Sequence, residues 1–249
     1  MLAALPSKAD DGAALGGDYF VGASVFLFQR TVLIPFAPAG VNDSMLDAGV
    51  IVQAHDNAVD EDGAVALDAI SGWLAASAFG QPESDPVPAL DQERRRALVC
   101  LVFGADPQGQ AALAHHAGLG DADRAACAAR YQDARKRWAA WLLPYRRTQD
   151  MPAPLRAAPE GAPAEGEPVL RLAFAPSIDE GDQAIADAMR KNGLFQVLTD
   201  DFNAALWMPR PMTALLTQCG EAKAFYNPDR GDAVLCYELL AELVKSAPK

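Results

Sequence analysis

Residues that commonly perform chemistry are sparse in this chain. It contains three histidines, His55, His115 and His116, beside 33 aspartates and glutamates. The neighbours His115 and His116 would point about 100° apart on a helix, so they do not hold one metal ion as an i, i+4 pair does, and we expect a surface pair. His55 precedes the acidic run 60–62. This pattern predicts a solvated acidic loop, and the alternative is a loose site for a divalent cation.

Four cysteines complete the set of nucleophilic and metal-binding candidates. They are Cys100, Cys127, Cys219 and Cys236, and no two of them form a C-x-x-C motif. A cysteine zinc knuckle and a thioredoxin-like motif are therefore not expected. The even number is compatible with disulfides, while four buried reduced thiols are the alternative. The chain also lacks a glycine-rich phosphate loop and a G-x-S-x-G motif.

The charge balance excludes several classes of partner. The 33 acids and 21 bases give a net charge of −12. No basic stripe is visible that would attract nucleic acid or an anionic membrane. No apolar run reaches the roughly 20 residues of a membrane span. The N-terminus lacks the apolar core of a secretory signal, which predicts a cytoplasmic protein unless an export signal has been removed.

Helices are predicted over most of the first 149 residues. Residues 1–17 are small and polar, which predicts a flexible lead, and Asp18 is a suitable N-cap for the apolar run 19–28. Helical spacing of apolar residues, with flanking acids or prolines, predicts the other helices. These cover residues 46–52, 64–78, 92–103, 108–117 and 121–143.

The composition changes at the proline-rich segment 150–168. Five prolines in nineteen residues predict a semi-extended linker between a helical half, residues 18–149, and a mixed half, residues 169–249. In the mixed half, alternation and turn residues predict two strands, a hairpin and three helices. They cover residues 169–174 and 212–217 (strands), 224–236 (hairpin), and 179–191, 194–206 and 237–245 (helices).

Two stretches resemble a bacterial family of predicted zinc metallopeptidases whose function is otherwise unknown. The mixed half contains CGEAKAFYNP at residues 219–228 and LCYEL at residues 235–239, close to the family pattern CG-x-x-NAFYDP followed by CYEL. The helical half contains LVCLVFGADP at residues 98–107, followed by Cys127 and Trp138 as in a second family pattern. In each stretch the combination of matching residues is specific for the family, although neither stretch is a catalytic motif.

The two stretches stand in exchanged order. In the family the CYEL half comes first, so this chain resembles a circular permutation in which residues 150–168 join the halves. Permutation costs little when the original termini lie close together. The alternative is a fragment of a tandem protein, with half of one copy ahead of half of the next. We expect the two halves together to form one domain.

The zinc motif of the family is missing from its expected place. Family members carry His-Glu-x-x-His on the helix after CYEL, where two imidazoles hold Zn²⁺ and the glutamate acts as general base. The corresponding positions here are occupied by Gln29, Arg30 and Leu33. Three acids are the candidates for remnants of the family's cleft: Glu61, Asp62 and Glu238.

The resemblance implies an α+β, mostly helical, zincin-like fold. A small sheet from the C-terminal half would pack on helices of both halves. The resemblance also implies two disulfides, Cys100–Cys127 and Cys219–Cys236, which would place the chain outside the cytoplasm. No cofactor is expected, because the ligands of the family's zinc are absent.

The leading functional interpretation is a metallopeptidase-like protein without a working zinc site, a pseudo-peptidase that binds a protein or peptide. Two alternatives stay open. One is an active zinc peptidase with a divergent site that uses His55 and Glu61. The other is an interaction or immunity-type protein that reuses the scaffold and its acidic surface.

Overall fold

The structure is a computed structural model that describes residues 11–56, 63–79, 92–147 and 170–247. It confirms the expected α+β class, because most described residues are helical and a small mixed sheet lies in the C-terminal half. The described residues form two compact units. The first unit lies within 1–26, 42–136 and 242–249, and the second within 27–41 and 137–241. Each unit therefore takes residues from both sides of the proline-rich segment.

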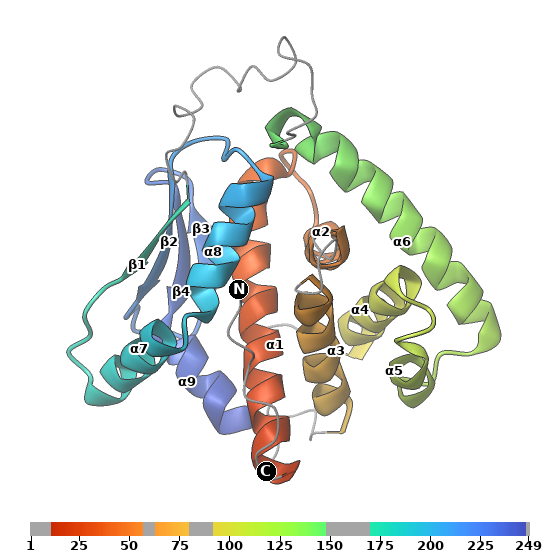
Figure 1. Ribbon diagram of the computed structural model, residues 1–249, viewed down its shortest axis with the longest axis horizontal. Helices are drawn as coiled ribbons and strands as arrows, with labels where there is room; N and C mark the ends of the chain where they lie inside the picture. The colour runs from red at the N-terminus through yellow and green to blue at the C-terminus, as the bar shows by residue number, and fades with distance from the viewer. Residues whose placement is uncertain (1–10, 57–62, 80–91, 148–169, 248–249) are drawn as a thin grey trace. The chain divides into compact units, whose positions relative to one another are not determined.

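The first unit is built from helices (Figure 1). Their bounds lie close to the predicted ones except at the start of the first helix. They are the greater part of α1 (Asp11–Leu33), α2 (Asp43–Asp56), α3 (Gly63–Phe79), α4 (Gln92–Ala105), α5 (Ala111–His116) and the greater part of α6 (Asp121–Leu142). The 3-10 turns Ile34–Phe36 and Leu143–Tyr145, each with a proline, follow α1 and α6 and belong to the second unit.

The start of α1 differs from the prediction. The helix begins at Asp11 and not after Asp18, because residues 11–18 contain no proline and include the good helix formers Ala13, Ala14 and Leu15. The stretch Tyr19–Phe36, which covers most of α1 and the 3-10 turn after it, has a mean hydropathy of 1.4 over 18 residues, enough by length and composition to cross a membrane. Of this stretch 72% is buried inside the structure, as in the core helix of a globular fold.

Two glycines permit close helix contacts in the first unit. A Cβ atom at Gly22 of α1 would lie 2.0 Å from the Ala69 carbonyl oxygen of α3. A Cβ atom at Gly104 of α4 would lie 2.4 Å from the Cys127 carbonyl oxygen of α6. Both distances are shorter than any van der Waals contact, so the helix backbones approach closely only because these two residues lack a side chain.

Tyr131 of α6 predicts how the stability of the first unit depends on pH. Its hydroxyl is buried and has no hydrogen-bond partner in the described part of the chain. Burial, reinforced by Asp56, raises its pKa above the ordinary 10.0. The unfolded chain therefore loses this proton first, so stability from this group is present below pH 10 and falls as the pH rises above it. Tyr131→Phe should raise the free energy of unfolding by about 1 kcal/mol at neutral pH and flatten the alkaline decline.

Tyr237 offers a matched control for this substitution. Its hydroxyl donates a 2.7 Å hydrogen bond to the Ala175 carbonyl oxygen, and burial raises its pKa as well. Tyr237→Phe should therefore lower the free energy of unfolding at neutral pH by about 1 kcal/mol, the opposite sign. Urea titrations at neutral pH and above pH 10 measure both variants. Equal losses for the two variants would contradict the assignment of Tyr131 as an unpaired hydroxyl.

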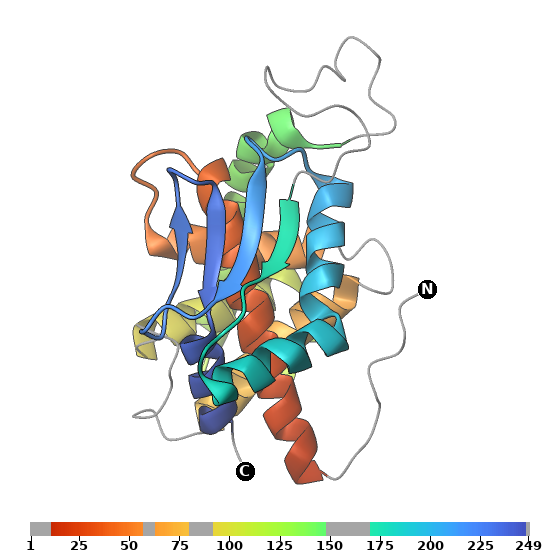
Figure 2. The same cartoon turned by 90° about the vertical axis from the view of Figure 1, so that its left-hand side faces the viewer.

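The second unit contains the sheet (Figure 2). Its strands are β1 (Leu170–Phe174), β2 (Met212–Thr217), β3 (Ala224–Asn227) and β4 (Asp232–Cys236). They lie in the order β1-β2-β4-β3, with β1, β2 and β4 parallel and β3 antiparallel to β4. The predicted hairpin is confirmed as β3 and β4. The sheet therefore has β4 as an inner strand and β3 as an edge strand.

Burial follows from this order. Every residue of β4 is buried, whereas β2 alternates, with Met212, Ala214 and Leu216 buried. The second unit also contains three helical segments: α7 (Glu180–Asn192), α8 (Leu194–Ala205) and the first part of α9 (Tyr237–Ser246). Of these, α8 contacts β1. The end of α1 joins them, because the Phe28 ring lies 5.5 Å from that of Phe195 on α8. A helix from the N-terminal half thus contributes to this core.

Candidate functional site at the strand ends

The three parallel strands of the second unit have their carboxyl ends on the same side of the sheet. β1, β2 and β4 end at Phe174, Thr217 and Cys236, and Figure 2 shows α7 and α9 beyond these ends. Ligands of open sheets with parallel strands bind outside the carboxyl ends, where loops and helix N-termini meet. A ligand site in the second unit is therefore expected at these carboxyl ends of the strands.

A disulfide joins two of these strand ends. Cys219 lies two residues after β2, Cys236 is the last residue of β4, and their Cα atoms are 5.5 Å apart. The second disulfide, Cys100–Cys127, connects α4 with α6 at a Cα separation of 5.0 Å. Both predicted pairings are confirmed. Disulfides form and persist in oxidising compartments, so the two bonds point to such an environment.

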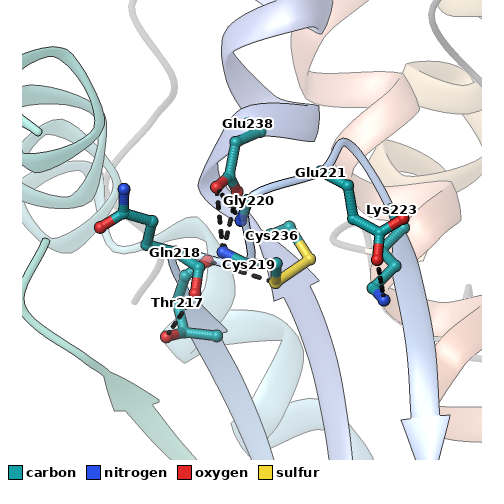
Figure 3. Close-up of a disulfide and its surroundings, with 8 residues drawn as sticks. All are labelled: Thr217, Gln218, Cys219, Gly220, Glu221, Lys223, Cys236 and Glu238. Atoms are coloured by element: carbon teal, nitrogen blue, oxygen red, sulfur yellow. Dashed lines mark hydrogen bonds and ion pairs between the residues drawn. A yellow bond between two sulfur atoms is a disulfide. The ribbon is translucent and has the colours of Figure 1, made fainter.

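The Glu238 carboxylate holds the loop that contains Cys219 (Figure 3). The Cys219 N–H lies 3.0 Å from Oε1 and 3.1 Å from Oε2, and the Gly220 N–H donates to Oε1 at 2.5 Å. Gly220 has φ 80°, a left-handed conformation that lets successive N–H groups converge on one anion. Glu238 also lies in the first turn of α9, where the helix dipole favours a negative charge.

Polar residues missed in the sequence analysis lie at the same strand ends. The Ser177 hydroxyl donates to Gln218 Oε1 at 3.1 Å, which joins the segment after β1 to the segment after β2. The Tyr237 hydroxyl, directly after β4, donates to the Ala175 carbonyl oxygen, directly after β1. The signal that could have found these residues is their position directly after predicted parallel strands.

The residues that the resemblance aligns with the family's zinc motif lie at the end of α1. Gln29 and Leu33 are 4% and 0% exposed, and their spacing places them on one buried face. No hydrogen-bond partner among the described residues reaches Gln29 Oε1. Arg30 is partly buried. An amide, a guanidinium and a hydrocarbon do not supply the imidazole, thiolate or carboxylate donors that Zn²⁺ requires, so these residues do not fit the ion.

Among the remaining candidates, those in the described part of the chain do not assemble a second site. Glu61 and Asp62 lie outside the described residues. His55 Nδ1 lies 3.4 Å from Asp56 Oδ1 at the end of α2. The adjacent histidines of α5 are exposed, and their ring centroids are 5.8 Å apart. Their exposure agrees with the expected surface pair.

One group of metal-ligating side chains converges in the described part of the chain. It consists of Cys219, Cys236 and Glu238, whose ligand atoms all lie within 4.8 Å of one another. In this structure the two sulfur atoms are bonded to each other, so the group offers one carboxylate and no thiolate.

Comparison with known proteins covers the same region. No curated protein and no solved structure matches the chain. A family model matches residues 174–248, from the last residue of β1 through α9, and this range includes the strand-end site but not α1. The C-terminal part of the chain is therefore similar to a family described as "Putative metallopeptidase".

Proposed function

We propose that this chain is a metallopeptidase-like protein that lacks the catalytic zinc and acts by binding a peptide. The observation that carries the proposal is the end of α1, where a buried amide, a guanidinium and a leucine lie at the positions that the resemblance assigns to the metal ligands and the base. Hydrolysis by a metallopeptidase near neutral pH needs the metal ion to generate hydroxide, and these side chains do not supply the ligands for one. The match of residues 174–248 supports the scaffold.

The edge strand β3 supplies a surface for an extended peptide. Hydrogen-bonded and non-hydrogen-bonded pairs alternate in an antiparallel ladder. Because the Cys236 N–H donates to the Lys223 carbonyl oxygen, the backbone groups of Ala224 and Tyr226 point away from β4. An added strand would pair with these groups, as peptides do with open sheet edges.

The proposal also covers the order of the two halves of the chain and the cellular location of the protein. We infer that the two halves are those of the family in exchanged order. The composition of the two compact units, each with residues from both sides of 150–168, supports this inference. The disulfides Cys100–Cys127 and Cys219–Cys236 support an extracytoplasmic location.

Metal analysis tests the loss of the zinc site. The oxidised chain should contain no stoichiometric zinc by plasma mass spectrometry. The triple variant Gln29→His, Arg30→Glu, Leu33→His should gain zinc, because it restores two imidazoles at i and i+4 on one helix face. Circular dichroism verifies that the variant is folded.

A variant with altered spacing is the control. Gln29→His, Arg30→Glu, Thr31→His carries the same new groups, but residues two apart do not face each other, so it should not gain zinc. Stoichiometric zinc in the unmodified oxidised chain, with peptidase activity that a chelator abolishes, would refute the proposal.

Binding without cleavage is the second test. The fluorescence anisotropy of fluorescein-labelled casein should rise when the oxidised chain is added. Mass spectrometry should show that the casein stays intact. Tyr226→Pro removes one outward N–H, a change that edge strands tolerate, and should weaken binding about threefold to tenfold. Arg171→Ala, an exposed change on the opposite edge strand β1, should leave binding unchanged. Cleavage of casein would contradict the proposed loss of catalysis, and equal binding by Tyr226→Pro would contradict an edge-bound peptide.

A further inference from the structure

The group formed by Cys219, Cys236 and Glu238 can exist in two chemical states. We propose that reduction of the Cys219–Cys236 disulfide converts it into a binding site for one zinc-class divalent ion, held by two thiolates and the Glu238 carboxylate. This inference concerns the strand-end site and does not depend on the substitutions in α1.

The three side chains come from elements that converge at the strand ends (Figure 3). Cys219 is in the loop after β2, Cys236 ends β4 and Glu238 is in the first turn of α9. Their ligand atoms lie within 4.8 Å of one another. In a tetrahedral site with Zn–S bonds of 2.3 Å, the sulfur atoms are ~3.8 Å apart. Once the disulfide is open, only side-chain adjustments are needed to reach this geometry.

The carboxylate is already oriented. The backbone N–H groups of Cys219 and Gly220 bind Glu238, with two contacts to Oε1 and one to Oε2. A carboxylate has about four lone-pair positions, so one at Oε2 remains for a metal ion. Hydrogen bonds of this kind orient metal-ligating carboxylates in known sites.

The access to the group suits three protein ligands and one solvent ligand. Cys236 is fully buried, while Cys219 and Glu238 are partly exposed. A reductant would therefore attack on the Cys219 side, and a water molecule would complete the coordination there. The two thiolates and the carboxylate carry three negative charges, one more than is needed to neutralise a divalent cation.

The chemistry balances with a phosphine as reductant. One phosphine and one water molecule convert the disulfide into two thiols and a phosphine oxide, with transfer of two electrons to the sulfur pair. The divalent ion then displaces one proton from each thiol and forms two metal–sulfur bonds.

Cobalt titration of the full chain tests the proposal. The chain is reduced with tris(2-carboxyethyl)phosphine, desalted without oxygen and titrated with Co²⁺, whose bonds to thiolates give a near-ultraviolet charge-transfer band. The reduced chain should bind one Co²⁺ with this band, and Zn²⁺ should displace it. The oxidised chain should show no band. Glu238→Gln should weaken the binding by at least about tenfold.

The second disulfide is the matched control. In the described part of the chain no third ligand accompanies Cys100 and Cys127. Cys100→Ser, Cys127→Ser should therefore keep the band, and Cys219→Ser, Cys236→Ser should lose it. The absence of a band in the reduced chain, or its persistence after both strand-end cysteines are replaced, would overturn the proposal.

A measurement on the unmodified chain covers the case in which a variant fails to fold. Zn²⁺ should protect Cys219 and Cys236, but not Cys100 and Cys127, from alkylation by iodoacetamide in the reduced chain, as read by mass spectrometry. Equal alkylation of all four would overturn the proposal. Zinc that is already present in the oxidised chain, by contrast, would count against the proposed loss of the α1 site and not against this one.

Discussion

Replacement of Asp47 by alanine should lower the free energy of unfolding by about 3–5 kcal/mol. The Asp47 side chain is 2% exposed, and both of its oxygens accept hydrogen bonds from Arg94, at 2.6 Å from Nε and 2.8 Å from Nη2. This pair connects α2 with α4. Asp47→Ala would remove the carboxylate that accepts both hydrogen bonds from the Arg94 side chain, which is 17% exposed, and breaking such a pair costs more than the pair itself contributes.

Two comparisons make this prediction specific. In the double variant Asp47→Leu, Arg94→Met, both charges are absent, so most of the lost stability should return. Arg96→Ala breaks the exposed Arg96–Asp123 pair, whose side chains are 56% and 50% exposed, and should cost less than about 1 kcal/mol. Urea titration followed by tryptophan fluorescence measures all three. A loss below about 1 kcal/mol for Asp47→Ala would show that the buried pair does not hold α2 to α4.

Removal of the Cys100–Cys127 disulfide should cost about 2–5 kcal/mol. The bond closes a separation of 27 residues and connects α4 with α6. Its removal gives the unfolded chain more conformational freedom. The folded helices should stay in place, because Gly104 still permits the close approach to Cys127 and Tyr131. The double variant Cys100→Ala, Cys127→Ala should therefore melt at a lower temperature and keep its helical circular dichroism.

The other disulfide supplies the control for this prediction. In the variant Cys219→Ala, Cys236→Ala, the bond between α4 and α6 remains, so a phosphine reductant should still lower the melting temperature. In the variant without both disulfides the reductant should have no effect. If the Cys100→Ala, Cys127→Ala variant melts at the temperature of the unmodified oxidised chain, this bond does not constrain the unfolded state.

Local elements were predictable from the sequence because local chemistry determines them. Asp179 accepts a hydrogen bond from the Asp182 N–H at the start of α7, and Gly193, with φ 73°, ends that helix. The turn residues 227–232 connect β3 to β4 as predicted. The predicted start of α1 was wrong, because the helix begins at Asp11 and not after Asp18. A good capping residue does not mark the start of a helix when the residues before it can also be helical.

The strand order was not accessible to the same reasoning. β4 lies between β2 and β3, and its parallel pairing with β2 joins residues that are about twenty positions apart. An alternating or apolar pattern indicates a strand but not its neighbour, because pairing depends on the packing of the whole sheet. The edge position of β3, on which the proposed peptide binding depends, follows only from this order.

The candidate site divides in the same way. The residue types alone show that Gln29, Arg30 and Leu33 cannot replace two histidines and a glutamate around zinc, and the resemblance suggested the two cysteine pairs. Only the tertiary structure shows that the Glu238 carboxylate lies on the Cys219 and Gly220 N–H groups and within reach of both sulfurs. Residue types and spacing determine local conformation and the chemistry that each side chain offers. Which side chains meet depends on long-range contacts that no single segment of the sequence encodes.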